Sequence, residues 1–122
     1  MRIRVYYEDT DVGGVVYHSN YLKFCERARS ELFFSRDMSP ILEEGAFVVR
    51  SLKADFLKPA VFGDLLDVRT EFLDMKAASL TLRQTILRGE ELLFEAQIRL
   101  AFVKDGKPVK IPQNTATIFT NA

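Results

Sequence analysis

The hydrophobic pattern near the start of the chain changes from a period of two residues to a helical period. Residues 2–7 alternate, with Ile3, Val5 and Tyr7 on one face, and this alternation predicts a half-buried strand. The segment from Glu8 to Gly14 is acidic and then contains two glycines, a composition that interrupts a strand. We therefore expect a strand followed by a loop.

An amphipathic helix is predicted after this loop. From Asn20 onward, apolar residues fall at the spacing of one helix face, while charged residues occupy the other face. Ser19 or Asn20 is the expected N-cap, because either side chain can accept hydrogen bonds from the first amides of the helix. Pro40 limits the far end of the helix. The apolar face consists of Tyr21, Phe24, Cys25, Ala28 and Leu32.

After Gly45 the two-residue period returns in four segments, each with one apolar face. Turn-forming residues separate these segments, and short connections favour antiparallel neighbours. The tail from Lys107 to Ala122 contains two prolines and is expected to add a short edge strand or to stay loosely ordered. The four apolar faces consist of Val48, Leu52, Ala54 and Phe56; Leu66, Val68 and Phe72; Leu80, Leu82 and Ile86; and Phe94, Ala96, Ile98, Leu100 and Phe102.

This order of elements predicts an α+β fold in a single domain spanning residues 1–122, with one long helix on a curved antiparallel sheet of about five strands. A chain of 122 residues suits a single hydrophobic core. One helix covers only one face of the sheet, so the other face and the edges stay exposed. We expect self-association, the alternative being a monomer with a polar outer face.

Composition and charge exclude several classes of function. The chain has 17 basic and 17 acidic residues, so no broad electrostatic field attracts nucleic acid or anionic lipid. Its one cysteine, Cys25, can form neither an internal disulfide nor a CxxC metal site. The first residues lack the apolar run of a signal peptide, and no segment has the composition of a membrane span. These features predict a cytoplasmic protein.

The residues with the clearest potential for catalysis precede the helix. Carboxylates between Glu8 and Asp11 lie next to the predicted helix N-terminus, where free amides and the helix dipole stabilise a negative oxygen. A carboxylate beside such an oxyanion hole can attack a carbonyl carbon or take a proton from water, and a thioester suits both routes. Gly13 and Gly14 would let a substrate approach the backbone closely. Judged by spacing alone, Asp9 and Asp11 would more commonly form an Asx turn or an N-cap than act in catalysis.

Two segments resemble a known family. The stretch YYEDTDVGGVVYHSNYLKFCERARSE, from Tyr6 to Glu31, is similar to the N-terminal signature of the 4-hydroxybenzoyl-CoA thioesterase-like hotdog family, and most similar to its Tol-Pal-associated acyl-CoA thioesterase branch. The shared features are a D-x-D motif, a turn containing glycine, and an Asn-Tyr pair that opens the long helix. The segment FLKPAVFGDLLDV, from Phe56 to Val68, resembles the connection into the next strand of that family. The resemblance covers most of the chain and implies a hotdog fold.

The resemblance also implies roles for individual residues. It assigns catalysis to Asp11, as nucleophile or general base, and assigns to His18 the backbone amide that polarises the thioester carbonyl. The His18 imidazole could also orient the substrate or assist proton transfer, although a lone histidine at a helix start is more often a solvated or capping residue. Tyr17 is a candidate for the acyl pocket, and Lys76 is a candidate contact for the phosphates of CoA.

The activity implied by the resemblance is that of an acyl-CoA thioesterase, which converts acyl-CoA and water to a free acid and CoA without a metal or redox cofactor. The implied partners are acyl-CoA, acyl carrier protein and further copies of the chain, in a dimer or a tetramer of dimers with the active site at an interface. Arg50, Lys58 and Arg88 are further candidates for phosphate contacts, although scattered basic residues usually only solubilise the surface. The alternatives are a hotdog hydratase or dehydratase, and a non-catalytic module that binds acyl-CoA or acyl carrier protein.

Overall fold

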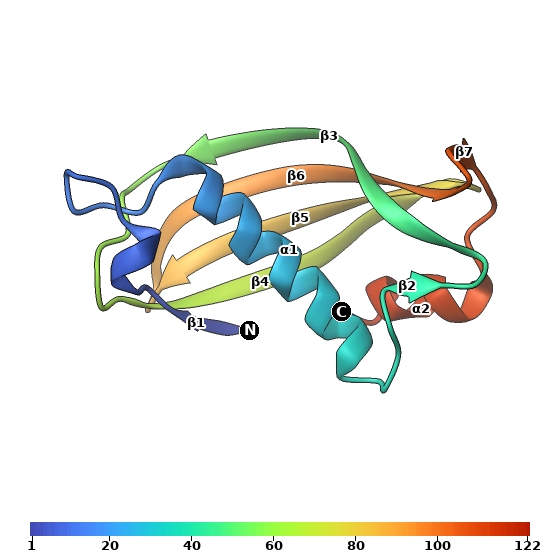
Figure 1. The fold of residues 1–122 in the computed structure, drawn as a ribbon, viewed down its shortest axis with the longest axis horizontal. Helices are drawn as coiled ribbons and strands as arrows, with labels where there is room; N and C mark the ends of the chain where they lie inside the picture. Colours follow the sequence, from blue (N-terminus) through green and yellow to red (C-terminus); the bar gives the residue numbers. More distant parts are fainter.

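The computed structural model describes residues 1–122 and contains one long helix, one short helix and one antiparallel sheet (Figure 1). The fold is α+β, as predicted. The two-residue strand β2 and the helix α2 come in addition to the predicted elements. In chain order the elements are β1 (Arg2–Arg4), a 3₁₀ helix (Tyr7–Asp9), α1 (His18–Phe34), β2 (Ile41–Leu42), β3 (Gly45–Phe56), β4 (Leu65–Met75), β5 (Ser79–Arg88), β6 (Glu91–Lys104), β7 (Lys107–Pro108) and α2 (Gln113–Thr120).

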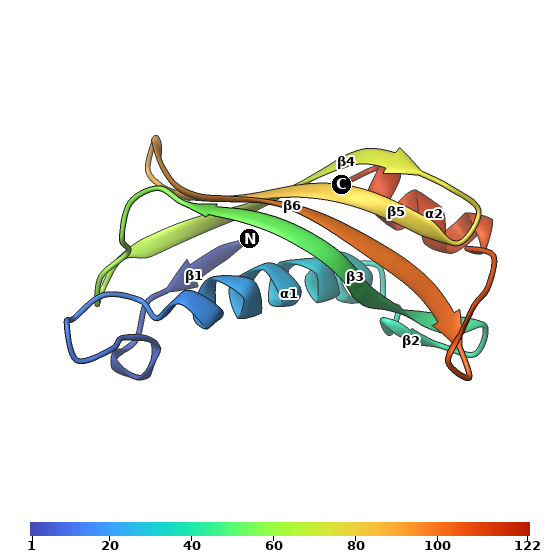
Figure 2. The same cartoon turned by 90° about the horizontal axis from the view of Figure 1, so that it is seen from above.

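The sheet has the strand order β1-β4-β5-β6-β3-β2, and β7 pairs with β6. All pairs of strands are antiparallel. Figure 2 shows that the sheet curves around α1, which lies along its concave face. Neither helix is long and apolar enough to cross a membrane.

The predicted apolar faces of β4, β5, β6 and α1 are largely confirmed. The residues predicted for β5 and β6 are all buried on the side of the sheet that faces the helix. Burial of these side chains removes apolar surface from water and attaches the helix to the sheet. Leu32 and Phe72 are only partly buried, and Phe33 is the buried residue in the last turn of α1. The largest of the fully buried side chains among them are Phe24, Leu66, Leu80, Leu82, Ile86, Phe94, Ile98, Leu100 and Phe102.

The first strand is shorter than predicted. β1 ends at Arg4, and Tyr7 lies in the 3₁₀ helix with 81% of its surface exposed, so its predicted place on the buried face is wrong. The Asp9 carboxylate accepts a hydrogen bond from the Tyr6 N–H at 2.9 Å, and the Thr10 hydroxyl donates to the Tyr7 carbonyl at 2.8 Å. These local bonds from side chains compete with the strand ladder.

The ends of α1 also differ from the prediction. The helix begins at His18, and its N-cap is Tyr17, which makes no capping hydrogen bond through its side chain. Neither Ser19 nor Asn20 is therefore the N-cap. The helix stops at Phe34, before the limit that Pro40 sets, and the chain reverses through Asp37 at a φ of 56°.

A bulge in β3 changes which residues face the helix. The pairing with β6 shifts between Val49 and Ser51, so one extra residue, Arg50, lies in this strand. Because paired residues share a face of the sheet, Val49 and Leu52 lie on the buried side with their partners on β6. Val48 lies on the opposite side, and its predicted place on one face with Leu52 is wrong.

The tail of the chain is folded, so the loosely ordered alternative does not hold. β7 provides the short edge strand that the sequence predicts, whereas α2 was not predicted. Four residues of α2 are buried, and the Phe119 ring meets the rings of Phe33 and Phe47 at centroid distances of 5.6 and 5.2 Å. The tail therefore closes one end of the core.

Replacing Phe119 with alanine should lower the free energy of unfolding by about 3–5 kcal/mol, because the ring is 1% exposed and its removal leaves a cavity. Phe34→Ala provides the control, since this ring is 52% exposed and its loss should cost less than about 1 kcal/mol. Chemical denaturation measures both variants. Equal losses would show that α2 does not pack against the core.

Candidate active site

The loop that carries Asp11 is attached to the first turn of α1 through one carbonyl group. The Asp9 carbonyl accepts hydrogen bonds from the Tyr17 N–H at 3.1 Å and from the Asn20 side-chain amide at 2.9 Å. Asn20 thus holds the loop instead of capping the helix. This carbonyl fixes the start of the loop relative to the helix N-terminus.

A second attachment connects the helix to the segment before β4. The Val16 N–H donates to the Ala60 carbonyl at 2.9 Å, and the Ala60 N–H donates to the Tyr21 hydroxyl at 3.0 Å. Tyr21 is buried, and its ring is stacked on Phe94 at a centroid distance of 5.3 Å. The hydroxyl therefore anchors the segment around Ala60 in the core.

Basic residues near this segment are already paired with carboxylates. Arg88 donates to Asp64 at 2.7 Å and to Glu91 at 2.6 Å, and Lys58 contacts Glu91 at 3.0 Å. The hydrogen bond from Arg88, and then that from Lys58, lower the pKa of the Glu91 carboxyl. Asp64 also accepts the Val61 N–H at 2.9 Å. Arg88 and Lys58 thus hold the segment before β4 in place.

Asp11 lies in a tight turn. Its Oδ1 accepts the Gly13 N–H at 2.8 Å, and its carbonyl accepts the Gly14 N–H at 3.1 Å. Gly14 has a φ of +81°, which a residue with a side chain rarely adopts. The geometry of an Asx turn is therefore present. Oδ2 accepts no hydrogen bond within the chain, so one carboxylate oxygen is free to act on a ligand.

A shallow hollow of about 730 Å³ opens beside Asp11. The rings of Tyr7 and Phe62 line it and are in edge-to-face contact at a centroid distance of 5.8 Å. Sequence reasoning missed both rings, because it placed Tyr7 in a strand and treated Phe62 as part of a turn. The only sequence signal for either ring was that Phe62 lies between Phe56 and Val68, in the second segment that resembles the family. The residues that line the hollow are Tyr7, Thr10, Asp11, Val12, Gly14 and Phe62.

His18 is the first residue of α1 and is exposed. Its backbone N–H donates to no acceptor within the chain, as expected for the first turn of a helix. Its ring lies edge-on to Phe56 at 5.1 Å and to Tyr17 at 5.8 Å. The amide required for an oxyanion hole is thus available, while Tyr17 and His18 lie outside the hollow beside Asp11.

Lys76 and Asp11 lie at opposite ends of the sheet. The loop with Asp11 adjoins the segment that precedes β4, whereas Lys76 follows the last residue of β4. β4 has 11 residues, so its ends are about 33 Å apart. A single chain therefore does not bring Lys76 to Asp11.

Cys25 is unsuited to act as a nucleophile. The thiol is buried, and this burial raises its pKa to about 12, against a smaller opposing effect of Arg29. The thiolate is the reactive form of cysteine, and it is nearly absent near neutral pH at this pKa. The free carboxylate of Asp11 is the better candidate for catalysis.

Comparison with known families gives a match over most of the chain. Residues 13–95 match the thioesterase superfamily. This range includes Gly13, Gly14, Tyr17, His18 and Lys76 but begins after Asp11. The role of Asp11 therefore depends on the D-x-D motif and on the geometry of its turn.

Individual proteins are similar over nearly the whole chain. A Helicobacter pylori protein named acyl-CoA thioesterase YbgC is 46% identical over 124 residues, which cover 93% of each chain. A probable thioesterase from Bartonella henselae has a TM-score of 0.87 at 35% identity, covering 92% of this chain and 97% of that one. A Thermus thermophilus thioesterase complexed with coenzyme A and zinc has a TM-score of 0.85 at 26% identity, covering 99% and 91%. The predicted hotdog fold is confirmed.

Tyr21→Phe should lower the free energy of unfolding by about 1–3 kcal/mol, because the buried Ala60 N–H loses its acceptor. Tyr17→Phe is the matched control, since the Tyr17 hydroxyl is exposed and makes no hydrogen bond; its change should stay within about 0.5 kcal/mol. Denaturant unfolding of both variants measures the difference. An unchanged stability in Tyr21→Phe would rule out the anchoring role.

Proposed function

Because the chain belongs to the thioesterase superfamily, we propose that it hydrolyses acyl-CoA to a free acid and CoA, with Asp11 as the catalytic carboxylate. The observation that carries this proposal is the open hollow in which one oxygen of Asp11 has no partner. The name of the Helicobacter pylori relative supports acyl-CoA as the substrate. The motif from Tyr6 to Glu31 supports the assignment to Asp11.

Two routes are chemically complete. In the first, Asp11 bonds to the carbonyl carbon and the C–S bond breaks. The CoA thiolate takes a proton from water, and the hydroxide formed from that water hydrolyses the mixed anhydride, which releases the acid and regenerates the Asp11 carboxylate. In the second, Asp11 takes a proton from water, the resulting hydroxide attacks, and that proton passes to the thiolate. In both routes a free amide such as the His18 N–H stabilises the oxyanion. Trapping an acyl-Asp11 anhydride distinguishes the first route from the second.

We propose that two copies of the chain pair along β3. Apart from the two-residue β2, this strand has β6 as its only neighbour, so its other edge carries unpaired backbone groups. On its inner face, Val49, Leu52 and Phe56 are about half exposed. An antiparallel twofold contact would satisfy the backbone and cover these side chains.

Such a dimer would complete the site. Antiparallel pairing sets the Phe56 end of one β3 beside the Phe47 end of the other. The turn with Lys76 lies at the Phe47 end of the sheet, because Phe47 pairs with Phe102, whose N–H donates to the Ala78 carbonyl. Lys76 of a second copy would therefore approach the end of the sheet that carries Asp11, where it could bind a phosphate of CoA. Two such dimers would form the tetramer.

Three further proposals concern the branch of the family, the location of the protein and the donor of the acyl group. We propose that the chain belongs to the Tol-Pal-associated branch, because the similarity between Tyr6 and Glu31 is strongest to that branch. We propose a cytoplasmic location, because it agrees with a substrate of the acyl-CoA class. Acyl carrier protein is a further candidate donor of acyl groups, since it presents the same thioester. Genomic neighbourhood, cell fractionation and assays with acyl carrier protein test these points.

Asp11→Asn should reduce kcat for acyl-CoA hydrolysis at least about 100-fold, because an amide neither attacks nor takes a proton. Asparagine can still accept the Gly13 N–H, so the turn is retained. Glu8→Gln is the control, because it removes a nearby exposed carboxylate outside the hollow, and its kcat should stay within about threefold. Thiol release measures both variants. Equal rates for wild type and Asp11→Asn would refute the assignment, and hydration of an enoyl-CoA without thiol release would favour a hydratase.

Leu52→Glu should dissociate the dimer, because it places a charge in the proposed contact along β3. Light scattering should give at least twice the chain mass of 14.0 kDa for the wild type and a single chain mass for the variant. Leu57→Glu, in an exposed position just after β3, should keep the wild-type mass. An unchanged mass for Leu52→Glu would place the contact elsewhere.

A further inference from the structure

Arg29 is a largely buried cation without a counter-ion. It lies in the middle of α1, on the side toward the sheet, and forms no ion pair in the chain. Burial lowers the pKa of its guanidinium, and the opposing effects of Cys25 and Glu26 are smaller. Desolvating a charge is unfavourable unless a partner compensates it. The structure therefore contains a cation that lacks a matching anion.

The position of the Arg29 side chain is fixed by the core. Its Nη1 donates to the Gln84 Oε1 at 2.9 Å. Gln84 is fully buried, and its Nε2 donates to the Cys25 carbonyl at 3.0 Å and to the Thr70 hydroxyl at 3.1 Å. A guanidinium has five N–H groups, and only this one hydrogen bond is formed. The remaining donors are oriented in advance for a ligand.

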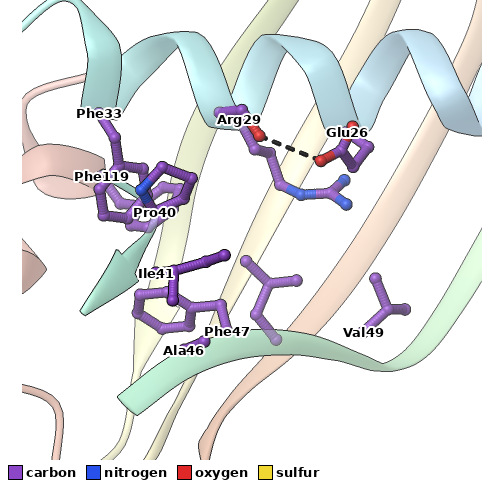
Figure 3. A pocket seen from close by; sticks show the side chains of 11 residues that line it. Glu26, Arg29, Phe33, Pro40, Ile41, Ala46, Phe47, Val49 and Phe119 are labelled. Atoms are coloured by element: carbon purple, nitrogen blue, oxygen red, sulfur yellow. Dashed lines mark hydrogen bonds between the residues drawn. The ribbon is translucent and has the colours of Figure 1, made fainter. Parts of the chain in front are cut away.

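Arg29 lines a pocket of about 250 Å³ between α1, β3 and α2. Figure 3 shows the Arg29 side chain extending from the helix into the space above β3, beside a group of apolar side chains. The pocket lies at the far end of α1 from His18 and is distinct from the hollow beside Asp11. Its lining consists of Glu26, Arg29, Ser30, Phe33, Pro40, Ile41, Ala46, Phe47, Val49, Leu100 and Phe119.

We propose that this pocket binds an aliphatic carboxylate, with the carboxylate on the Arg29 guanidinium and the alkyl chain against Phe33, Phe47 and their apolar neighbours. A carboxylate matches the fork of guanidinium donors. An alkyl chain contacts the apolar wall, whereas phosphate has no apolar part to place there, so the lining favours an aliphatic carboxylate over phosphate. The site does not depend on the proposed reaction, although the acid released by that reaction has the same chemistry.

Glu26 does not supply the missing anion. It lines the same pocket, but its carboxylate is exposed and accepts a hydrogen bond from the Ser30 hydroxyl at 3.0 Å. It is not within ion-pair distance of Arg29. A ligand carboxylate can therefore reach the guanidinium without displacing an existing pair.

Calorimetric titration with octanoate and with octanol tests the proposal, because the two probes share an alkyl chain and differ in charge. The wild type should bind octanoate at least about 10-fold more tightly than octanol. Arg29→Gln should weaken octanoate binding about 10-fold or more and abolish the preference. Arg27→Gln, which removes an exposed charge from the same helix, should bind as the wild type does. Equal affinities in the wild type, or a preference that survives Arg29→Gln, would overturn the proposal.

Ser30→Phe keeps Arg29 and fills part of the pocket from the side of α1, so it tests the site even if Arg29→Gln unfolds. It should weaken the binding of octanoate about 10-fold, whereas Ser19→Phe, at an exposed position of the same helix outside the pocket, should not. Failure of octanoate to bind the wild type at millimolar concentration would also overturn the proposal. Binding is measured without turnover, so an inactive Asp11 refutes the proposed function and leaves this site unaffected.

The carboxylate could come from a free acid or from the far end of an acyl chain. If it is a free acid, octanoate should inhibit hydrolysis of octanoyl-CoA in the wild type and not in Arg29→Gln. If it belongs to the substrate, suberyl-CoA should show a lower KM than octanoyl-CoA, and Arg29→Gln should remove the difference. If neither effect is observed, the pocket takes no carboxylate during turnover. That result would overturn a role for the pocket in this enzyme.

Discussion

The hydrogen bond between the Ala60 N–H and the Tyr21 hydroxyl joins the parts of the chain on which the candidate active site depends. Tyr21 belongs to the first turns of α1, and Ala60 belongs to the segment before β4 that also receives the Val16 N–H. Because Tyr21 is buried against Phe94, the bond is shielded from water and its loss would leave a buried amide unpaired. The position of the loop with Asp11 follows from this buried contact.

A single chain supplies several of the groups that the proposed reaction requires. It supplies a carboxylate with one free oxygen, a free amide at the start of α1 and two aromatic rings around a hollow. It also leaves the edge of β3 unpaired and keeps Lys76 at the far end of the sheet. An antiparallel contact between two copies would address both points, since it joins the free edges and brings opposite ends of the sheet together. Association and catalysis would then depend on the same surface.

Two groups of basic residues differ in how they are paired. Arg88 and Lys58 are paired with carboxylates and stabilise a segment near Asp11. Arg29 is held by the amide of Gln84 and faces an apolar pocket without a carboxylate partner. The first group is saturated, so its residues are poor candidates for ligand contacts. Arg29 has further N–H groups without an acceptor. The pocket beside Arg29 is therefore where we propose that a further ligand binds.

The sequence by itself determined the elements that depend on local periodicity. The apolar faces of α1, β5 and β6 follow from spacings of three to four or of two residues, and such spacings persist whatever the chain packs against. The D-x-D motif and the two glycines likewise identified the turn around Asp11, because the turn is formed by neighbours in the chain. The roles assigned to the side chains of this turn remain predictions.

Only the tertiary structure decided features in which distant segments meet. The bulge at Arg50 reverses the faces of β3, and it is defined by the register against β6 and not by the pattern within the strand. Phe62 meets Tyr7, and Phe119 meets Phe33 and Phe47, because the chain folds back on itself. The sequence pattern does not identify Arg29 as a largely buried donor, and only its packing against Gln84 makes it one. Local patterns fix which face of an element is apolar, whereas long-range contacts fix what that face touches.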